Sequence, residues 1–247
     1  MRYALDKNGN KICADDAQKD GEYFCQLCKT KMILRKGMVN VAHFAHKSNK
    51  ECDPWYEPKG MWHVWNQNLF TQDCIEVPII EDGEKHIADV YIEKYKTIIE
   101  FQHSPITKEV FEERNNFYTK NGRRIIWVFD FSEKDTIEQM DSVFAQSDQF
   151  LKFRWKHRSK FIESAKGNKN IDLIFYINQG GLQFNFLTNL SAIQCDKRRG
   201  LYNGYLHVTW SAEGYKFFGG YGSPYYGNYN KMLNKLIRQG GLNFAVN

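Results

Sequence analysis

Apolar and polar residues alternate with a period of two in two segments, residues 86–92 and 97–102. Because successive side chains of a β-strand point to opposite faces of the sheet, this alternation predicts two strands. The stretch between them, residues 93–96, is polar enough to turn. The pattern therefore predicts a β-hairpin with one core-facing side.

The predicted hairpin brings two acidic residues together. In a symmetric antiparallel register that sets Ile92 opposite Thr97, Asp89 lies opposite Glu100. Gln102 then follows on the same face as Glu100. Two carboxylates directly opposite each other repel and weaken a hairpin, so the pair indicates a cation between them. The alternative interpretation is a solvated strand face, on which acids are common.

Further elements are predicted on both sides of the hairpin. Apolar residues at helical spacing predict a helix before it, and the helix after it is closed by Asn121-Gly122. A short strand precedes the hairpin, and a continuous apolar strand of the buried kind follows the second helix. In chain order we expect a helix at 61–70, a strand at 75–80, the hairpin, a helix at 107–121 and a strand at 124–131.

A cysteine-rich segment near the N-terminus has the spacing of a four-ligand zinc site. Cys25 and Cys28 form a tight pair, and a second pair from His46 and Cys52 follows at a distance. Zinc takes such thiolates and imidazoles in a tetrahedral arrangement. His43 competes with His46 for the third position. The alternatives to zinc are a disulfide or free buried thiols; the sequence shows no secretory signal, which disfavours a disulfide framework.

Charge is distributed unevenly along the 247 residues, although the net charge is only +5. Residues 151–247 hold 14 Lys and Arg against 4 Asp and Glu, whereas residues 1–150 hold 20 against 25. A basic half joined to an acidic half suits a protein that acts on a polyanion. In the basic half, cations alternate with aromatic residues, which predicts contact with nucleic-acid phosphates; a solvated face is the alternative. These cations are Lys152, Arg154, Lys156 and Arg158.

The remainder of the C-terminal region predicts β-strands at 171–177, 182–190 and 205–210, separated by Gly-rich turns. No run approaches the roughly 20 apolar residues that a membrane span needs. We therefore expect a cytoplasmic protein.

An ordered series of motifs resembles the competence protein CoiA family, which belongs to the PD-(D/E)XK nuclease superfamily. The series runs from Ala88-Asp89-Val90 through IEFQHSPI and Glu113-Arg114 to the apolar strand IIWVF. The Cys-x2-Cys pair and the HFAH segment extend the resemblance toward the N-terminus. The resemblance implies an α+β or α/β core with a mixed sheet flanked by helices. We expect a zinc-binding module at 1–54, a nuclease core at 55–150 and a basic β-rich region at 151–247.

The resemblance also implies metal-dependent cleavage of phosphodiester bonds. Asp89 and Glu100, helped by the backbone carbonyl of Phe101, are the expected ligands of Mg²⁺ or Mn²⁺, which prefer hard oxygen donors. The superfamily usually has a Lys where this chain has Gln102. Gln supplies no positive charge, but its amide can hydrogen-bond a water or a phosphate oxygen. The resemblance implies that Gln is normal at this place.

Three further residues are candidates for the same site. Relatives commonly carry an acid and a His on the first core helix, and here the helix contains His63 but no acid. Glu57 is the nearest upstream carboxylate and equally suits a helix start. His63 either orients phosphate or water, or is a structural interface residue. Arg114 either clamps a phosphate or pairs with Glu100 or a neighbouring acid.

The sequence thus predicts a metal-dependent deoxyribonuclease. The alternative is a DNA-binding accessory protein of weak or no catalytic activity, acting in DNA uptake, recombination or phage defence. DNA is the expected partner, together with recombination or defence-system proteins. The strand form of the DNA and the oligomeric state stay open.

Overall fold

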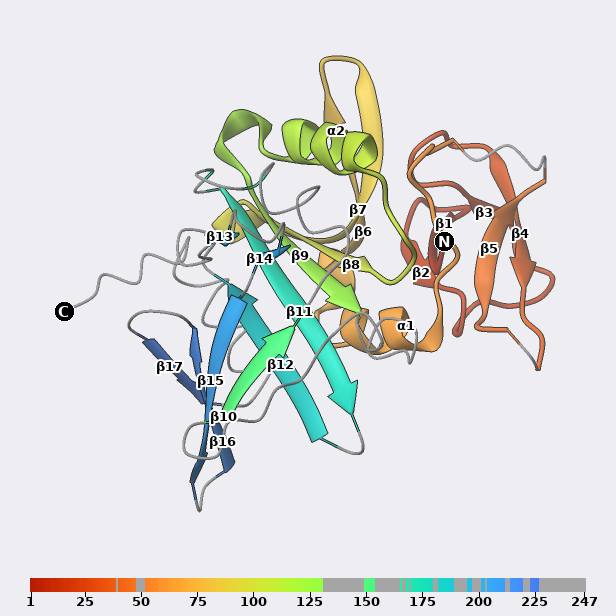
Figure 1. Ribbon diagram of the computed structural model, residues 1–247. Coiled ribbons are helices and arrows are strands. Elements are labelled where there is room, and N and C mark those ends of the chain that lie inside the picture. The colour runs from red at the N-terminus through yellow and green to blue at the C-terminus, as the bar shows by residue number, and fades with distance from the viewer. Residues whose placement is uncertain are drawn as a thin grey trace. The chain divides into compact units, whose positions relative to one another are not determined.

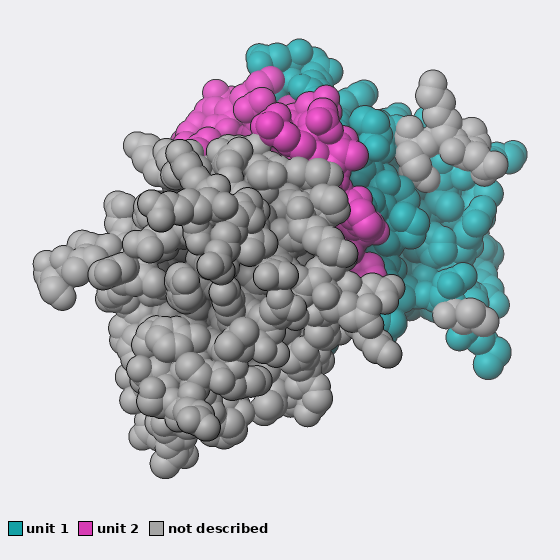
Figure 2. Space-filling view, in the orientation of Figure 1, with its two compact units in different colours: residues 1–93, 98–100 teal, residues 94–97, 101–247 magenta. Residues whose placement is uncertain are grey.

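The computed structural model describes residues 1–38, 40–47, 52–130, 165, 168 and 170–173 with their side chains, and further strands by their backbone alone. The chain divides into two compact units (Figure 2). Unit 1 comprises residues 1–93 and 98–100, and unit 2 comprises residues 94–97 and 101–247.

Unit 1 begins with a five-stranded antiparallel sheet in the strand order β2-β1-β3-β4-β5 (Figure 1). The hairpin β1–β2 turns at Asn8-Gly9, where Gly9 has a φ of 84° that side chains rarely adopt. The five strands are β1 (Tyr3–Asp6), β2 (Lys11–Cys13), β3 (Tyr23–Phe24), β4 (Lys31–Arg35) and β5 (His43–His46).

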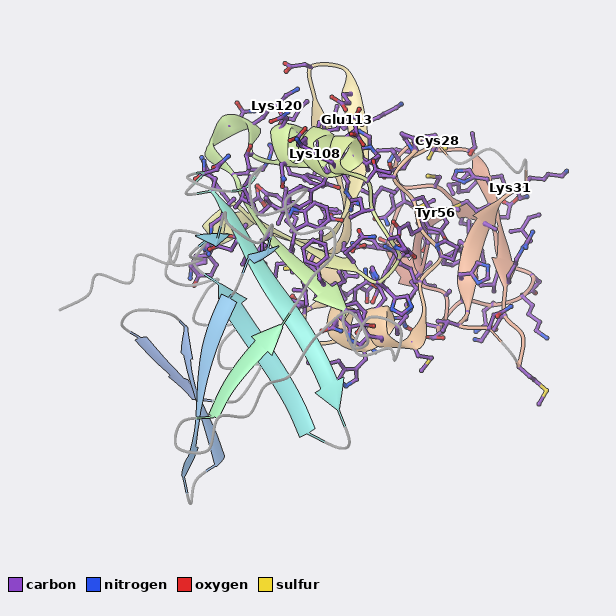
Figure 3. The ribbon with its side chains drawn as sticks, viewed as in Figure 1. Cys28, Lys31, Tyr56, Lys108, Glu113 and Lys120 are labelled. Carbon is purple, nitrogen blue, oxygen red and sulfur yellow. The ribbon has the colours of Figure 1, made fainter. Side chains whose placement is uncertain are left out.

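The core of this sheet is small. Its largest members are Tyr23 and Phe44, whose ring centroids lie 4.9 Å apart, and most of the others are Ala, Cys, Met or Leu. The chain start is bonded to β5, since Met1 N donates to Phe44 O (3.0 Å) and Phe44 N donates to Met1 O (2.7 Å). Met1 N also donates to the hydroxyl of Tyr56 at 3.1 Å; Tyr56 is labelled in Figure 3. So few large apolar side chains give such a module little independent stability.

The rest of unit 1 contains the predicted first helix and the strands next to it. These elements are α1 (Met61–Gln67), the 3₁₀ turn η1 (Gln72–Cys74), β6 (Ile75–Glu81), β7 (Glu84–Ile92) and the residues Ile98–Glu100 of β8. Within this unit the strand order is β6-β7-β8, and β6 pairs antiparallel with β7. The helix is three residues shorter than predicted because Leu69 N and Phe70 N bond three residues back, to Asn66 O and Gln67 O.

Strand β8 (Thr97–Gln102) follows the 3₁₀ turn η2 (Glu93–Tyr95), and its two ends belong to unit 2. All six of its residues are buried. The observed β7 and β8 confirm the predicted hairpin, while the burial of both faces of β8 corrects the expectation of one core-facing side.

Unit 2 continues with α2 (Lys108–Tyr118), the 3₁₀ turn η3 (Lys120–Gly122) and β9 (Arg124–Asp130). Thr107 caps α2, because its side chain accepts a hydrogen bond from Val110 N. Asn121 and Gly122 have φ values of 58° and 70° and close the helical segment, as predicted. Phe111 on α2 packs against Trp127 on β9, with ring centroids 4.9 Å apart.

The C-terminal region is rich in β-strands, which confirms its predicted character. In unit 2 the strand order is β8-β9-β11-β12, with β9 parallel to β11 and β11 antiparallel to β12. A second sheet has the order β10-β15-β16-β17, and β13 pairs with β14. The strands are β10 (Gln149–Phe153), β11 (Ile171–Gln179), β12 (Leu182–Thr188), β13 (Cys195–Asp196), β14 (Leu201–Tyr202), β15 (Gly204–Ser211), β16 (Gly214–Gly219) and β17 (Ser223–Tyr226).

Mixed sheets with few helices place the described part of the chain in the α+β class. None of the helices in the described residues is long and apolar enough to cross a membrane. The predicted phosphate contact Lys152 lies in β10, of which the backbone alone is described, and Arg154, Lys156 and Arg158 lie outside the described residues. The three-part division at residues 54 and 150 stays a prediction.

Candidate functional site

Asp89 and Glu100 lie on the adjacent strands β7 and β8, as predicted. The backbone N–H of Asp89 donates a hydrogen bond to Glu100 Oε1 at 3.2 Å. The two residues are only 5% and 1% exposed. The interpretation of a solvated strand face is therefore wrong, and two buried acids require compensating charge or hydrogen bonds.

A cation lies beside Asp89, and it comes from the segment that precedes α1. Lys59 Nζ donates to Asp89 Oδ1 and forms an ion pair with it. His63 Nε2, on the first turn of α1, lies 3.1 Å from the same oxygen. Both side chains are largely buried, at 14% and 7% exposure. One carboxylate oxygen is thus shared by an ammonium and an imidazole.

The pKa values show which of these groups carries charge. Burial lowers the pKa of His63 and outweighs the opposing effect of Asp89, so the neutral imidazole is favoured. Burial also acts to lower the pKa of Lys59, but Asp89, Glu76 and Glu100 raise it above its ordinary value. Burial alone would raise the pKa of Asp89, yet His63 and Lys59 hold it well below its usual range. At neutral pH the carboxylate of Asp89 and the ammonium of Lys59 are therefore the charged pair.

Glu76 is a third buried acid at this site, with 1% of its surface exposed. It lies between two paired positions of β6 and β7, Ile75 with Val90 and Val77 with Ala88, and therefore at the level of Asp89. Its φ of 47° is strained for a side chain of this kind and costs about 1–3 kcal/mol.

The carboxylate of Glu76 binds the start of the N-terminal sheet. Arg2 N donates to its Oε1 at 3.0 Å, and Tyr3 N donates to its Oε2 at 2.9 Å. Two hydrogen bonds from backbone N–H groups satisfy a buried carboxylate well. Strand β1 is thereby attached to β6 at the same level as Asp89.

Helix α1 presents two polar side chains, one turn apart, to β7. His63 contacts the Asp89 carboxylate, and Gln67 Nε2 donates to the backbone carbonyl of Asp89 at 3.2 Å. Residues four apart share one face of a helix, so this face fixes both the backbone and the side chain of Asp89. Glu57 lies half-buried in the irregular segment before α1, two residues from Lys59 in the sequence.

Gln102 and Arg114 contact each other in unit 2. Arg114 Nη1 lies 3.5 Å from Gln102 Oε1, and Gln102 Nε2 donates to Ser104 O at 2.7 Å. The Arg114 guanidinium also lies over the Trp127 ring, 4.8 Å from its centroid, and the residue is 6% exposed. These contacts orient the Gln102 amide. Phosphate binding by Arg114 and metal binding by the carbonyl of Phe101 stay predictions.

The predicted zinc ligands meet at one point in unit 1. The ligand atoms of Cys25, Cys28, His46 and Cys52 all lie within 4.8 Å of one another. Cys25 Sγ is 3.5 Å from Cys52 Sγ, and Cys28 Sγ is 3.3 Å from His46 Nε2; Cys28 is labelled in Figure 3. In a tetrahedral zinc site with bonds of about 2.0–2.3 Å, neighbouring ligand atoms are roughly 3.3–3.8 Å apart. The four residues can therefore hold a metal such as zinc.

The geometry decides two of the alternatives for this cluster, the disulfide and the choice of histidine. The cysteines whose side chains are described are all free, including Cys25 and Cys52, so the disulfide interpretation is wrong. His46 faces the cluster, whereas His43 Nδ1 lies 2.8 Å from Val41 O.

Burial raises the pKa of Cys25 and Cys52, and a metal cation would counter that effect by stabilising the thiolates. Burial opposes ionisation of Cys28 as well, but hydrogen bonds from Thr30 and His46 lower its pKa to about 6.

The cysteine cluster is connected to β7 through the residue that follows Cys52. Asp53 accepts hydrogen bonds from Trp55 N at 2.9 Å and from Ile87 N at 2.7 Å. Its Oδ1 also lies 2.9 Å from His86 Nδ1, and the Trp55 ring stacks on His86 at an interplanar angle of 8°. We call this set of contacts the Asp53 clamp. It fixes the chain between the cluster and Lys59.

Three residues of the two sites were missed from the sequence. Lys59 carries a weak signal as the cation just ahead of the first helix, and its contact with Asp89 spans 30 residues. Glu76 carries a stronger signal, because it is a lone acid at the start of the apolar strand 75–80. Asp53 directly follows a predicted zinc ligand, where a carboxylate often serves a supporting role.

Comparison with known proteins places the two sites in segments that match family models. Residues 6–54 match the family model of the competence protein CoiA N-terminal domain, and residues 65–199 match that of the competence protein CoiA nuclease-like domain. Competence protein CoiA of Bacillus subtilis (strain 168) is 24% identical over an alignment of 140 residues that covers 53% of this chain and 37% of the relative. The chain thus spans little more than a third of that relative's length. No solved structure matches this chain. Because the nuclease-like match alone covers more than half of the residues, the chain belongs to the competence protein CoiA family.

Proposed function

We propose that this protein is a metal-dependent nuclease that hydrolyses DNA, with a site of the PD-(D/E)XK type. The observation that carries the proposal is the buried pair of Asp89 and Glu100 on adjacent strands, with Lys59 and His63 directed at Asp89. Buried acids that need an internal cation form a site suited to a divalent ion. The nuclease-like family match supports the same reaction class.

The side chains of the site have distinct roles in this proposal. Asp89 and Glu100 supply the carboxylate oxygens that hold Mg²⁺ or Mn²⁺. When bound, such an ion neutralises charge on the phosphate and lowers the pKa of an attacking water. Gln67 holds the backbone of Asp89 in place, and His63, which is neutral at pH 7, can accept a proton from water.

The N-terminal cluster supplies a structural zinc site in this proposal. Cys25, Cys28, His46 and Cys52 provide a complete set of four ligands, and a closed set leaves no position for substrate. Because the surrounding core is small, bound metal would supply much of the stability of the N-terminal sheet.

The test is a cleavage assay on single- and double-stranded DNA and on RNA, with Mg²⁺, Mn²⁺ or EDTA. We expect cleavage of DNA with either metal and none in EDTA. Asp89→Asn and Glu100→Gln should abolish it, whereas Glu93→Gln, an exposed acid in the turn of the same hairpin, should not. Cleavage that survives both site substitutions at saturating metal would refute the assignment.

A second candidate function is DNA binding without cleavage, as an accessory protein in uptake, recombination or defence. The presence of Gln102, which supplies no positive charge, favours it. The same assay separates the two functions, because an accessory protein retains DNA in a filter-binding experiment and leaves it intact with every metal. In either case we propose DNA as the partner and the cytoplasm as the location.

A further inference from the structure

Lys59 is fixed more firmly than a surface lysine. It lies between Pro58 and Gly60, just ahead of α1, and its side chain is 14% exposed. The Asp53 clamp holds the chain six residues before it, and α1 holds the chain after it. Its ammonium reaches Asp89 Oδ1, an oxygen that the proposed function assigns to a metal ion.

Lys59 lies at the oxygen that a metal ion would use. Its ammonium contacts Asp89 Oδ1, and the carboxylates of Glu76 and Glu100 also act on it. Asp89 and Glu100 are neighbours, since Asp89 N donates to Glu100 Oε1 at 3.2 Å. A divalent cation bound to these two acids would therefore compete with the ammonium for Asp89 Oδ1.

An ion pair made only for stability is a poor explanation of this arrangement. A buried pair gains little over apolar residues of similar volume, because both charges must lose their hydration. Buried ionisable groups that contact one another, as Lys59 and Asp89 do, are enriched at functional sites.

We propose that Lys59 is an exchangeable cation: its ammonium leaves Asp89 Oδ1 when a divalent ion binds the carboxylates, and then contacts a phosphate oxygen of the nucleic acid. The inference rests on the proposed metal site and deepens it. The Lys59 ammonium supplies the positive charge that Gln102 lacks, from a different segment of the chain. The proposed exchange also means that Lys59 and metal compete for one oxygen.

The first test measures metal affinity without catalysis. Calcium is the probe, because it binds oxygen ligands and not the thiolate cluster. By calorimetry on the full chain, Lys59→Met should bind Ca²⁺ about tenfold more tightly than the wild type, since the competing charge is gone. Lys85→Met, which removes an exposed lysine from the same strand as Asp89, should bind like the wild type, and Asp89→Asn should not bind. Equal or weaker affinity in Lys59→Met would overturn the inference.

The second test uses the wild-type protein and does not depend on the folding of a variant. An amine-reactive ester labels lysines at rates that rise with their accessibility, and mass spectrometry reads each position. Lys59 should be labelled slowly in EDTA and at least several-fold faster with saturating Ca²⁺, while Lys85 should not change. A Lys59 rate that is the same in EDTA and in Ca²⁺ would show that the ammonium stays on Asp89, and the inference would fail.

These measurements separate the inference from the nuclease proposal. If both calcium effects are observed but the wild type cleaves no nucleic acid, the nuclease proposal fails and the exchange at Asp89 stands. If the wild type cleaves DNA, Lys59→Met should lower the rate at saturating metal by at least about tenfold, the size of one lost charge-assisted contact. Cleavage at the wild-type rate by that variant would overturn the phosphate-binding role of Lys59.

Discussion

Asp53 Oδ1 lies 2.9 Å from His86 Nδ1, and this contact joins the residue after a cysteine ligand to the strand that carries Asp89. The other oxygen of Asp53 accepts the N–H of Ile87, the next residue of the same strand. The two proposed metal sites are therefore connected within unit 1 by one carboxylate. A substitution at one of these two sites should therefore alter the stability or metal affinity of the other.

Replacing Asp53 with Ala should lower the free energy of unfolding by about 1–3 kcal/mol, because buried His86 and the part-buried N–H of Ile87 both lose their partner. The same variant should release zinc more easily, since Cys52 loses its fixed neighbour. Urea unfolding and competition with a chelator measure the two effects. Asp20→Ala, at an exposed position, is the control. Unchanged stability and zinc retention in Asp53→Ala would show that the Asp53 clamp stabilises neither the fold nor the zinc site.

The purified protein should contain one zinc ion per chain, because the ligand set of the N-terminal cluster is complete. Metal analysis of the Cys25→Ser, Cys28→Ser double variant should show its loss, and the N-terminal sheet should then unfold first. The matched control is the Cys13→Ser, Cys74→Ser double variant, which alters cysteines outside the cluster. Full zinc content in the first variant, or none in the wild type, would contradict the assignment.

Asp89→Asn should destabilise the protein by about 3–5 kcal/mol, because it removes the carboxylate that pairs directly with the buried Lys59 ammonium. Relief of repulsion between Asp89 and Glu100 would predict the opposite sign, so the measurement decides which effect dominates. In a double-mutant cycle read by urea unfolding, Asp89→Asn with Lys59→Met should be more stable than Asp89→Asn alone. A double variant less stable than the single one would argue against the pair.

The free energy of unfolding should fall in acid, because the pKa values of His63 and Asp89 are both depressed in the folded protein. Burial holds the pKa of His63 below its ordinary 6.5, so its contribution is complete above pH 6.5 and is lost as the pH falls through the folded value. The pKa of Asp89 is held below 3.8, so its contribution is lost only at lower pH. Urea midpoints measured across this range should decline below pH 6.5. His63→Gln should flatten the first part of the decline, and an unchanged profile would be contrary to expectation.

Neutralising the basic cluster should weaken DNA binding without changing the chemistry. For the variant in which Lys152, Arg154, Lys156 and Arg158 are replaced by Gln, the salt dependence of binding should flatten by roughly 0.7–0.9 log units per lost phosphate contact. A fluorescent oligonucleotide with Ca²⁺ in place of Mg²⁺ measures binding alone. Equal slopes for the variant and the wild type would mean that these residues form a solvated face.

The hairpin was predictable from the sequence because its signal is local. Alternation over six or seven residues located both strands, and the pairing rule then set Asp89 beside Glu100. The cysteine cluster was predictable for a similar reason, since ligand type and spacing restrict a zinc site severely. The choice between His43 and His46 required the structure, because both lie on one short strand.

Lys59 and Glu76 were not predictable, because their roles depend on contacts distant in the sequence. Glu76 accepts hydrogen bonds from backbone groups more than 70 residues away, and it adopts a left-handed conformation. The metal ion expected between the two acids stays a prediction, and no local pattern indicates that Lys59 contacts Asp89. Local patterns locate strands, whereas burial of charge is decided by tertiary packing.

The two hydrogen bonds that Glu76 accepts from Arg2 and Tyr3 bear on how this protein can be divided. A fragment cut to the nuclease-like segment, residues 65–199, would retain Glu76, Asp89 and Glu100 but lose both donors and the Lys59 ammonium. The acidic site would then lose these two hydrogen bonds and one compensating charge, while the hydrogen bond from Asp89 N to Glu100 Oε1 would remain. We therefore expect this fragment to be less stable than one that also includes the first strand of the chain.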